Sequence, residues 1–247
     1  MICGWGAMTD FKPVTSNKAA VLYPLWLVSA AVGVIAFGFS HTIGRVLLDP
    51  PAPAPAILWA HVALASTWLL VLLGQAALVA LGRVDLHRRL GALGAIVGAV
   101  MSVVAFFTAV ELRKLDTEGD PVANIAYLAI PLAAWLTFTV PFTLALVWRR
   151  EPARHRPLMI MAACAVVGPA LGRIPEIRHA GLYWAGLIPD LMMLSAMAHE
   201  RWRRGRWNAA YAAGVPLMVL TQGAFVFLQI AQPPAWIAAA RWLMSVF

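Results

Sequence analysis

Long apolar runs, separated by short polar segments, dominate the pattern of hydrophobic and polar positions along the chain. A helix that crosses the roughly 30 Å hydrocarbon core of a bilayer needs about 20 predominantly apolar residues. Seven runs reach or approach that length, and the fifth and sixth are the shortest. They cover residues 20–40, 57–81, 90–110, 124–148, 157–172, 181–198 and 208–230. The pattern predicts an all-α fold, a polytopic transmembrane helix bundle with about seven spans.

Composition favours the same environment. Hydrophobic residues make up 62% of the 247 residues and charged residues 12%, whereas a typical soluble domain is about half apolar and about a quarter charged. The mean hydropathy is +0.77. A single soluble core of this size cannot bury so much apolar surface. We therefore expect a multi-pass protein of a bacterial inner membrane, with the lipid bilayer as its main partner.

The net charge of +8 would suggest nucleic acid in a soluble protein. Here the charges lie in short loops between apolar runs, so we expect no nucleic-acid partner. The loops GRVDLHRR, RREPARHR and ERWRRGR, together with Lys12 and Lys18, hold most of the 19 basic residues. The alternate loops DPPAPAPA, LRKLDTEGDP and RIPEIRHA hold more of the acidic residues. The positive-inside rule then places the N-terminus in the cytoplasm and the C-terminus outside.

Three segments follow from this pattern. Residues 1–19 form a cytoplasmic N-terminal tail, residues 20–231 the seven-helix transmembrane domain, and residues 232–247 a C-terminal segment. The last segment is amphipathic, and Trp236 and Trp242 would suit the headgroup level of an interfacial helix. Packing of the same segment against the bundle is an equal alternative.

Polar residues inside apolar runs are the first candidates for function, because polar groups in hydrocarbon are costly. Asp190 follows Pro189 inside the sixth run, and Gln222 lies inside the seventh. The functional interpretation of Asp190 is a carboxylate that handles protons or binds a ligand. The alternative is a structural aspartate, protonated or hydrogen-bonded to a neighbouring helix.

A polar stripe marks the second run. His61, Trp68 and Gln75 are spaced by seven residues, which is nearly two helical turns, so the three side chains share one face. Such a stripe would line a cavity if it pointed into the bundle. Hydrogen bonds between helices are the competing explanation.

Histidines at the ends of the runs suggest a bound cofactor. Two histidines from different helices at one depth can ligate haem iron or another transition metal. On the outer side, His41 and His61 are the candidate metal ligands. Arg45 and Arg173 lie near the same level, where they could hold propionates or another anionic group.

On the inner side, His87 and His155 are the candidate pair, since each precedes an arginine in a similar basic loop. For each single histidine the alternative is a helix-end or interfacial residue. The helix dipole and anionic headgroups both favour cations at such positions.

Common catalytic motifs do not occur in the sequence. There is no Gly-rich phosphate loop and no G-x-S-x-G elbow. His199-Glu200 is followed by Arg203 where a zinc-protease helix would carry its second histidine. The seventh run has no lysine for a retinal Schiff base. The sequence therefore assigns no catalytic residue and leaves open whether the protein is an enzyme.

Two stretches resemble a large group of uncharacterised bacterial seven-helix membrane proteins. The first carries a His-x6-Trp-x6-Gln stripe and a His-Arg-x-Leu-Gly loop, here His61, Trp68, Gln75, Gly82, Arg83, His87, Arg88, Leu90 and Gly91. The second carries His155, Arg156, Met159, Pro169 and Arg173. Asp190 also falls where the group tends to carry an aspartate. The resemblance covers about Trp59 to Asp190 and implies seven helices, but no established activity. Pro157 departs from the pattern and is expected to shift the start of the fifth helix.

Three functions remain open. The first is a redox protein that binds haem or a metal ion through its helix-end histidines. The second is a small-molecule or proton-coupled transporter or binding protein centred on Asp190. The third is a non-catalytic accessory subunit of a membrane complex, for which the 11 tryptophans would supply contacts with the partner.

Overall fold

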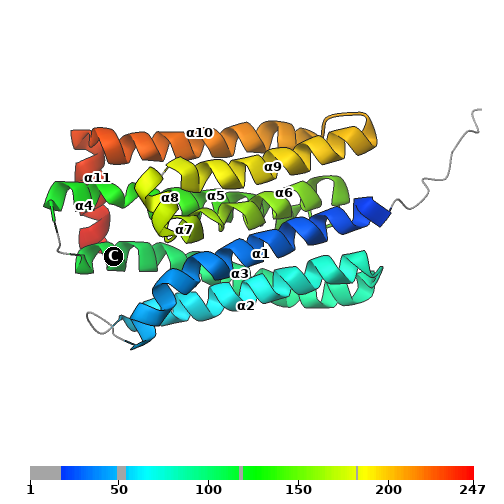
Figure 1. Cartoon of the computed structure of the whole chain (residues 1–247), viewed down its shortest axis with the longest axis horizontal. Helices are drawn as coiled ribbons and strands as arrows, with labels where there is room; N and C mark the ends of the chain where they lie inside the picture. Colours follow the sequence, from blue (N-terminus) through cyan, green and yellow to red (C-terminus); the bar gives the residue numbers. More distant parts are fainter. Residues whose placement is uncertain (1–17, 49–53, 117–118, 182) are drawn as a thin grey trace, which may run out of the picture.

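The computed structural model describes residues 18–48, 54–116, 119–181 and 183–247, which form eleven helices and no strand (Figure 1). The longer helices are α1 (Lys18–Leu48), α2 (Ala56–Ala80), α3 (Val84–Leu115), α5 (Ala129–Val147), α9 (Tyr183–Arg204) and α10 (Ala209–Ala231). The shorter helices are α4 (Pro121–Tyr127), α6 (Pro152–Ala165), α7 (Gly168–Leu171), α8 (Pro175–Ala180) and α11 (Pro234–Val246). The prediction of an all-α fold is confirmed.

Five helical segments among the described residues are long and apolar enough to cross a membrane. They are Leu22–Gly44, Ala56–Ala80, Val84–Leu115, Pro121–Val147 and Ala209–Ala231. The chain is therefore an integral membrane protein with several spans. The fifth and sixth apolar runs of the sequence correspond to α6 with α7 and to α9, which are not in this set. Seven spans remain a prediction.

The fifth run differs in its boundaries from the expectation. The helix α6 begins at Pro152 and ends at Ala165, and the four-residue α7 continues the run. Pro152 suits the first helical position, because that position needs no N–H donor and the fixed φ of proline fits it. Pro157 is buried inside the helix, so it does not set the helix start.

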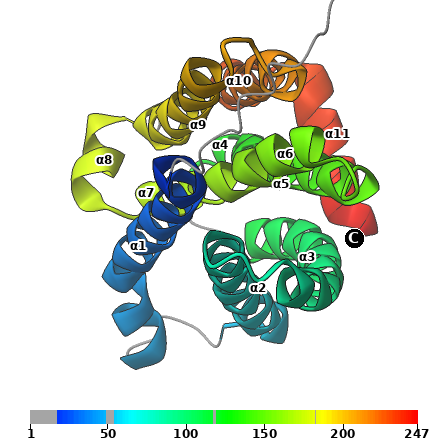
Figure 2. The same cartoon turned by 90° about the vertical axis from the view of Figure 1, so that its right-hand side faces the viewer.

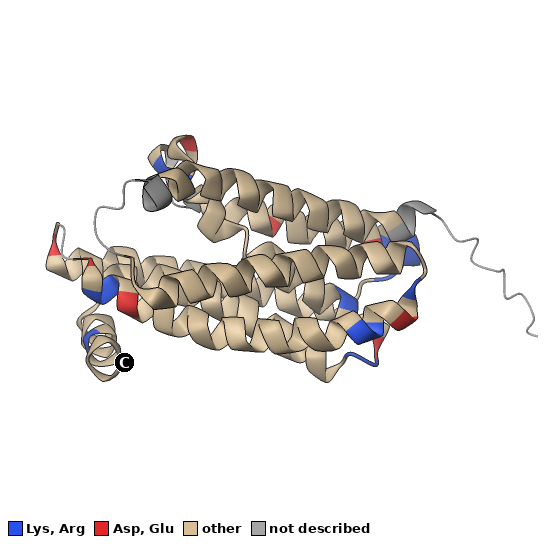
Figure 3. Ribbon diagram, turned by 90° about the horizontal axis from the view of Figure 1, so that it is seen from below, with Lys and Arg blue, Asp and Glu red and all other residues tan. Residues whose placement is uncertain are grey.

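The long helices run side by side along the molecule (Figures 1 and 2). Chain neighbours pair as hairpins, α2 with α3, α5 with α6 and α9 with α10, and α6 also contacts α1, α9 and α10. The three hairpin turns lie at the same end as the start of α1, and Lys and Arg gather there (Figure 3). We call this the basic end. This grouping agrees with the alternation of basic loops in the sequence.

The core lies where α2, α3, α5, α6 and α10 meet. Trp68 is 2% exposed and its ring contacts Phe138 and Phe142 in edge-to-face geometry, with ring centres 5.0 and 6.0 Å away. A Cβ on Gly98 of α3 would lie only 2.3 Å from the Phe142 ring. The small residue therefore lets α3 approach this aromatic cluster closely.

The C-terminal helix α11 lies across the end of the bundle opposite the basic end (Figure 1). It packs on α4 and α3, and the Trp236 Nε1 donates a hydrogen bond of 3.2 Å to the carbonyl of Ala126. Ala240 is fully buried, whereas Trp242 is 59% exposed. The helix thus packs against the bundle on one face, and Trp242 on the other face is free to meet headgroups.

Candidate functional site

Two of the candidate histidines meet at the basic end. His87 lies in the first turn of α3 and His155 in the first turn of α6, and their ring centres are 6.5 Å apart with an interplanar angle of 80°. Each follows the tight turn of a hairpin. At the α2–α3 turn Gly82 has φ +69°, a conformation that glycine adopts without strain. The two hairpin turns thus bring the rings together from segments far apart in the sequence.

The His155 ring is oriented by the backbone. Its Nδ1 lies 2.9 Å from the carbonyl oxygen of Ala145, a fully buried residue of α5. A carbonyl oxygen only accepts hydrogen bonds, so Nδ1 carries the proton and donates. In the neutral ring Nε2 is then the nitrogen with a free lone pair. Metal-binding histidines are commonly oriented by such a bond from the second ring nitrogen.

Unpartnered polar atoms surround the same place. The Nδ1 of His87 and both amide atoms of Gln75 are buried, and they make no hydrogen bond with a described group. The backbone carbonyl of Gln75 also faces the His87 ring. Gly91 of α3 lies beside the amide, because a Cβ there would be in ordinary van der Waals contact with the Gln75 Nε2, 3.7 Å away. Buried polar groups are nearly always paired with protein, water or a ligand. These atoms are therefore suited to binding a water molecule or a ligand.

We call His87, His155 and Gln75 the histidine cluster. It offers two imidazoles and one amide, each of which can donate a lone pair to a metal ion. Among the described residues there is no group of three or more His, Cys, Asp or Glu side chains that could hold a metal ion. A metal at the histidine cluster would therefore have only two imidazole ligands, with its other positions open to the amide, water or another molecule.

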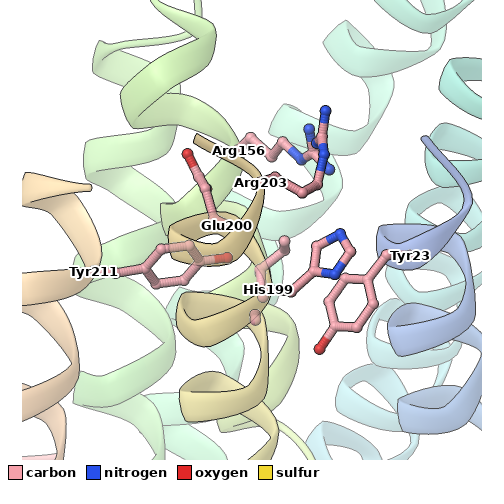
Figure 4. Close-up of a pocket in the computed structure, with 8 residues that line it drawn as sticks. Tyr23, Arg156, His199, Glu200, Arg203 and Tyr211 are labelled. Carbon is pink, nitrogen blue, oxygen red and sulfur yellow. The ribbon is translucent and has the colours of Figure 1, made fainter. Parts of the chain in front are cut away.

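A small pocket also lies at the basic end, on the side of α6 away from the histidine cluster (Figure 4). His155 belongs to the histidine cluster, whereas the next residue, Arg156, lines this pocket. The Tyr23 ring stacks on His199, with ring centres 4.0 Å apart and an interplanar angle of 9°. The cavity is about 10 Å³, which is room for about one water molecule. The buried Nε2 of His199 has no partner among the described groups, so a water there would satisfy it.

Glu200 anchors this pocket. It is 8% exposed, and one carboxylate oxygen accepts hydrogen bonds from the Asn208 amide at 2.8 Å and the Arg204 Nε at 2.9 Å. Asn208 also caps α10, since its Oδ1 accepts from the backbone N–H of Ala210. Glu200 thus joins the end of α9 to the start of α10. This role fits a structural carboxylate.

The sequence did not indicate this pocket, because it marked His199 only as part of an incomplete zinc-protease motif and Arg156 only within the resemblance. The residues missed are Tyr23, Arg156, Glu200, Arg203 and Tyr211. One signal was available, because His199 and Arg203 are one helical turn apart on the same face. The contribution of α1 and α10 depends on how the helices are arranged in space.

The outer candidates are separated into different environments. His41 is exposed and its Nδ1 contacts the carbonyl of Phe37 on its own helix, at 3.0 Å. His61 is half-buried, and its Nδ1 has no partner in the described part of the chain. No ring contact joins the two among the described residues. The side chain of Arg45 lies outside the described residues.

Arg173 is the cation that lies near His61. Its guanidinium stands 4.2 Å from the centre of the Phe39 ring and donates to the carbonyl of Pro169. The structure therefore places Arg173 within electrostatic range of His61 and leaves His41 on the surface. Arg173 is held by α1 and α7, where it remains available to an anionic group near His61.

The polar stripe of α2 divides into three environments. Trp68 packs in the hydrophobic core and does not line the pocket around His199. Gln75 belongs to the histidine cluster, and His61 lies within electrostatic range of Arg173. The shared helix face therefore meets three different environments along the depth of the bundle.

Asp190 and Gln222 meet between α9 and α10. The Gln222 Nε2 donates a hydrogen bond of 3.0 Å to the Asp190 Oδ1. Gly186, one turn before Asp190, leaves room for the amide, because a Cβ there would lie 2.8 Å from the Gln222 Oε1. Buried Cys164 of α6 lies close enough to interact with the carboxylate. Both polar residues singled out inside the sixth and seventh runs thus belong to one pair.

Comparisons of the chain with protein-family models, with curated proteins and with solved structures gave no match.

Proposed function

We propose that the protein binds a transition metal, as a bare ion or as haem iron, between His87 and His155 and has a redox role in a bacterial inner membrane. The main support is the 6.5 Å separation of the two imidazole centres. With nitrogen–metal bonds of about 2.1 Å, two imidazoles on opposite sides of one metal place their centres about 6 Å apart. Small side-chain movements bring the pair to that distance.

The hydrogen bond of His155 supports the same proposal. Because its Nδ1 donates to Ala145, the lone pair of Nε2 is available to a metal. Imidazole suits iron, copper, zinc and nickel. A structural zinc site has four protein ligands, whereas the histidine cluster has two imidazoles and one amide. An open coordination sphere favours a metal that exchanges electrons or ligands.

The resemblance to the uncharacterised seven-helix group stays a prediction, and it bears on the same residues. Gln75, His87, Gly91 and His155 all belong to the two stretches that carry the resemblance. They lie on three helices, and the structure brings them to one place. A shared ligand site at the basic end explains why these residue types occur together.

We also propose seven spans, with the N-terminus in the cytoplasm. The collection of basic residues at one end supports this orientation. The histidine cluster would then lie near the cytoplasmic surface. Single cysteines placed at Arg150 and Glu176 test this, with both native cysteines, Cys3 and Cys164, replaced by Ala. A membrane-impermeant thiol reagent should label the Arg150 position only in inside-out vesicles and the Glu176 position only in right-side-out vesicles.

Metal content and the absorption spectrum of the purified protein test the proposed site. We expect about one equivalent of iron, copper or another transition metal, with a Soret band if the metal is held in haem. His87→Ala and His155→Ala should each lose most of the bound metal. His179→Ala, a surface histidine in α8, is the matched control and should keep it. Equal metal content in all four proteins, or no metal in any, would contradict the proposal.

A second candidate function is proton-coupled transport or small-molecule binding at Asp190. The observation that favours it is the hydrogen bond from Gln222 within the bundle, since ionisable groups there are commonly functional. Asp190→Asn keeps the size of the side chain and removes its ability to ionise. In liposomes that hold a pH-sensitive dye, this variant should lose proton movement that the parent protein shows. Full activity of the variant would exclude this role.

A further inference from the structure

A large groove opens at the basic end, separate from the histidine cluster. It lies between the end of α5, the start of α6 and the first turns of α10, and its volume is about 590 Å³. These helices lie beside one another in the bundle (Figure 2). Leu217, at one end of the groove, is 60% exposed, and so is Trp207 at the other. The groove therefore opens on the outer surface of the bundle, where lipid would lie.

Small residues on one face of α10 create the groove. Ala209, Ala210, Ala213 and Gly214 line it, and their spacing places them on neighbouring rows of the same helix face. Gly214 lies against α6, because a Cβ there would lie 2.7 Å from the Met161 sulfur. Leu144 of α5 and Leu158 of α6 form the facing wall. The result is a trough with apolar sides.

The mouth of the groove is cationic. Arg154, Arg204 and Arg206 line it, and no Asp or Glu is among the lining residues. Arg204 pairs with Glu200, and Arg154 pairs with Glu151 at 3.3 Å while both remain about half exposed. Arg206 is exposed. Exposed ion pairs contribute little to stability, so Arg154, together with the exposed Arg206, can turn to an anionic ligand at little cost. Arg204 stays paired with the buried Glu200.

The depth of the groove fits one leaflet of a bilayer. From Ala209 to Leu217 the helix advances by eight residue steps, which is about 12 Å. Half of the hydrocarbon core is about 15 Å thick. Trp148 and Trp207 stand at the charged end, the level at which tryptophan gathers in membrane proteins. The charged mouth and the apolar trough thus lie at the levels of a headgroup and of an acyl chain.

We propose that this groove binds an anionic glycerophospholipid. Its phosphate would meet Arg154 and Arg206, and one acyl chain would lie along the small face of α10 against Leu144 and Leu158. Arginine is well suited to phosphate, because its planar guanidinium can donate two parallel hydrogen bonds. Basic pockets between helices at the cytoplasmic side are a recognised form of lipid site.

Lipid binding to the purified full-length protein tests the proposal. Native mass spectrometry with added phosphatidylglycerol or phosphatidylcholine gives the occupancy of each lipid and its Kd. We expect phosphatidylglycerol to bind at least about tenfold more tightly than phosphatidylcholine. The double variant Arg154→Gln/Arg206→Gln should lose that preference. The matched control is Arg149→Gln/Arg150→Gln, which removes the same charge from exposed residues of the α5–α6 turn that do not line the groove.

A second variant tests the apolar part. Ala213→Phe fills the trough without changing the charge, and we expect it to weaken the binding of phosphatidylglycerol at least about tenfold while the arginines remain. Equal binding of the two lipids by the parent protein would overturn the proposal. So would an equal loss in the Arg149/Arg150 control, which would show an effect of surface charge alone. If another protein co-purified with the parent but not with the Ala213→Phe variant, the groove would be assigned to a protein partner instead.

Discussion

The ring centres of His87 and His155 are 6.5 Å apart, although the two residues lie in the first turns of helices that belong to different hairpins. The hydrogen bond from His155 to Ala145 fixes one ring, while the Nδ1 of His87 and the amide of Gln75 are buried without partners among the described groups. This combination of an oriented donor and unpartnered neighbours distinguishes the cluster from the other helix-end histidines.

Replacement of Gln75 by Leu should separate ligand binding from stability. The amide is buried and unpartnered in the described part of the chain, so its removal should leave the empty protein equally stable or stabilise it by about 1 kcal/mol. Metal affinity should fall about 10–100-fold, the range found when groups around a metal site are removed, because the site loses one of its three candidate ligands. Chelator competition and unfolding in mixed micelles measure the two effects. Gln229→Leu on α10 is the control, and an equal effect of the control on affinity would contradict the assignment.

Gly38→Ala tests the contact between α1 and α7. A Cβ at Gly38 would lie 2.3 Å from the backbone oxygen of Ala170, so one helix must move. We expect the free energy of unfolding to fall by about 1–3 kcal/mol. Gly33→Ala on the same helix meets nothing within 4 Å and should be neutral or stabilising by about 0.5–1 kcal/mol. Equal effects of the two substitutions would show that α1 does not pack on α7 in this way.

Glu200→Ala tests the link between α9 and α10. The substitution leaves Asn208 and Arg204 without their shared acceptor in a site where Glu200 is 8% exposed. We expect a loss of about 1–3 kcal/mol in the free energy of unfolding. The control is Glu151→Ala, because its ion pair with Arg154 is about half exposed and should contribute less than about 1 kcal/mol. Thermal unfolding in one detergent compares the two variants directly.

Trp68→Ala tests whether Trp68 is a core residue or lines a cavity. The side chain is 2% exposed and contacts two phenylalanine rings, so its loss should cost about 3–5 kcal/mol. Trp26→Ala removes a side chain that is 71% exposed and should leave the stability of the purified protein nearly unchanged. A small loss in the free energy of unfolding for both variants would instead indicate that Trp68 faces an open cavity.

Much of the fold follows from the sequence. Long apolar runs predict helices in lipid, and basic loops at alternate positions predict which helix ends lie together. The boundaries of the fifth run were harder to predict, because Pro152 begins α6 within a charged stretch that hydropathy treats as loop. The short α7 and α8 also depend on local turns that a window of 20 residues averages out.

The sites follow from the sequence only in part. The spacing of His61, Trp68 and Gln75 predicts a shared face of one helix, but the neighbours of that face depend on the order of helices in the bundle. Trp68 meets two aromatic rings and Gln75 meets His87, although both lie on the same stripe. The pocket around His199 needs Tyr23 and Tyr211 from the first and last long helices, and no local pattern in the sequence joins these segments.

X-ray absorption at the edge of the bound metal tests the central claim most directly. We predict two imidazole nitrogens at about 2.0–2.1 Å from the metal in the parent protein. The metal that remains in His87→Ala or His155→Ala should have one imidazole ligand, and the metal in His179→Ala should have two. A metal with no imidazole ligand, or a spectrum that is the same in all four proteins, would contradict a metal centre between His87 and His155.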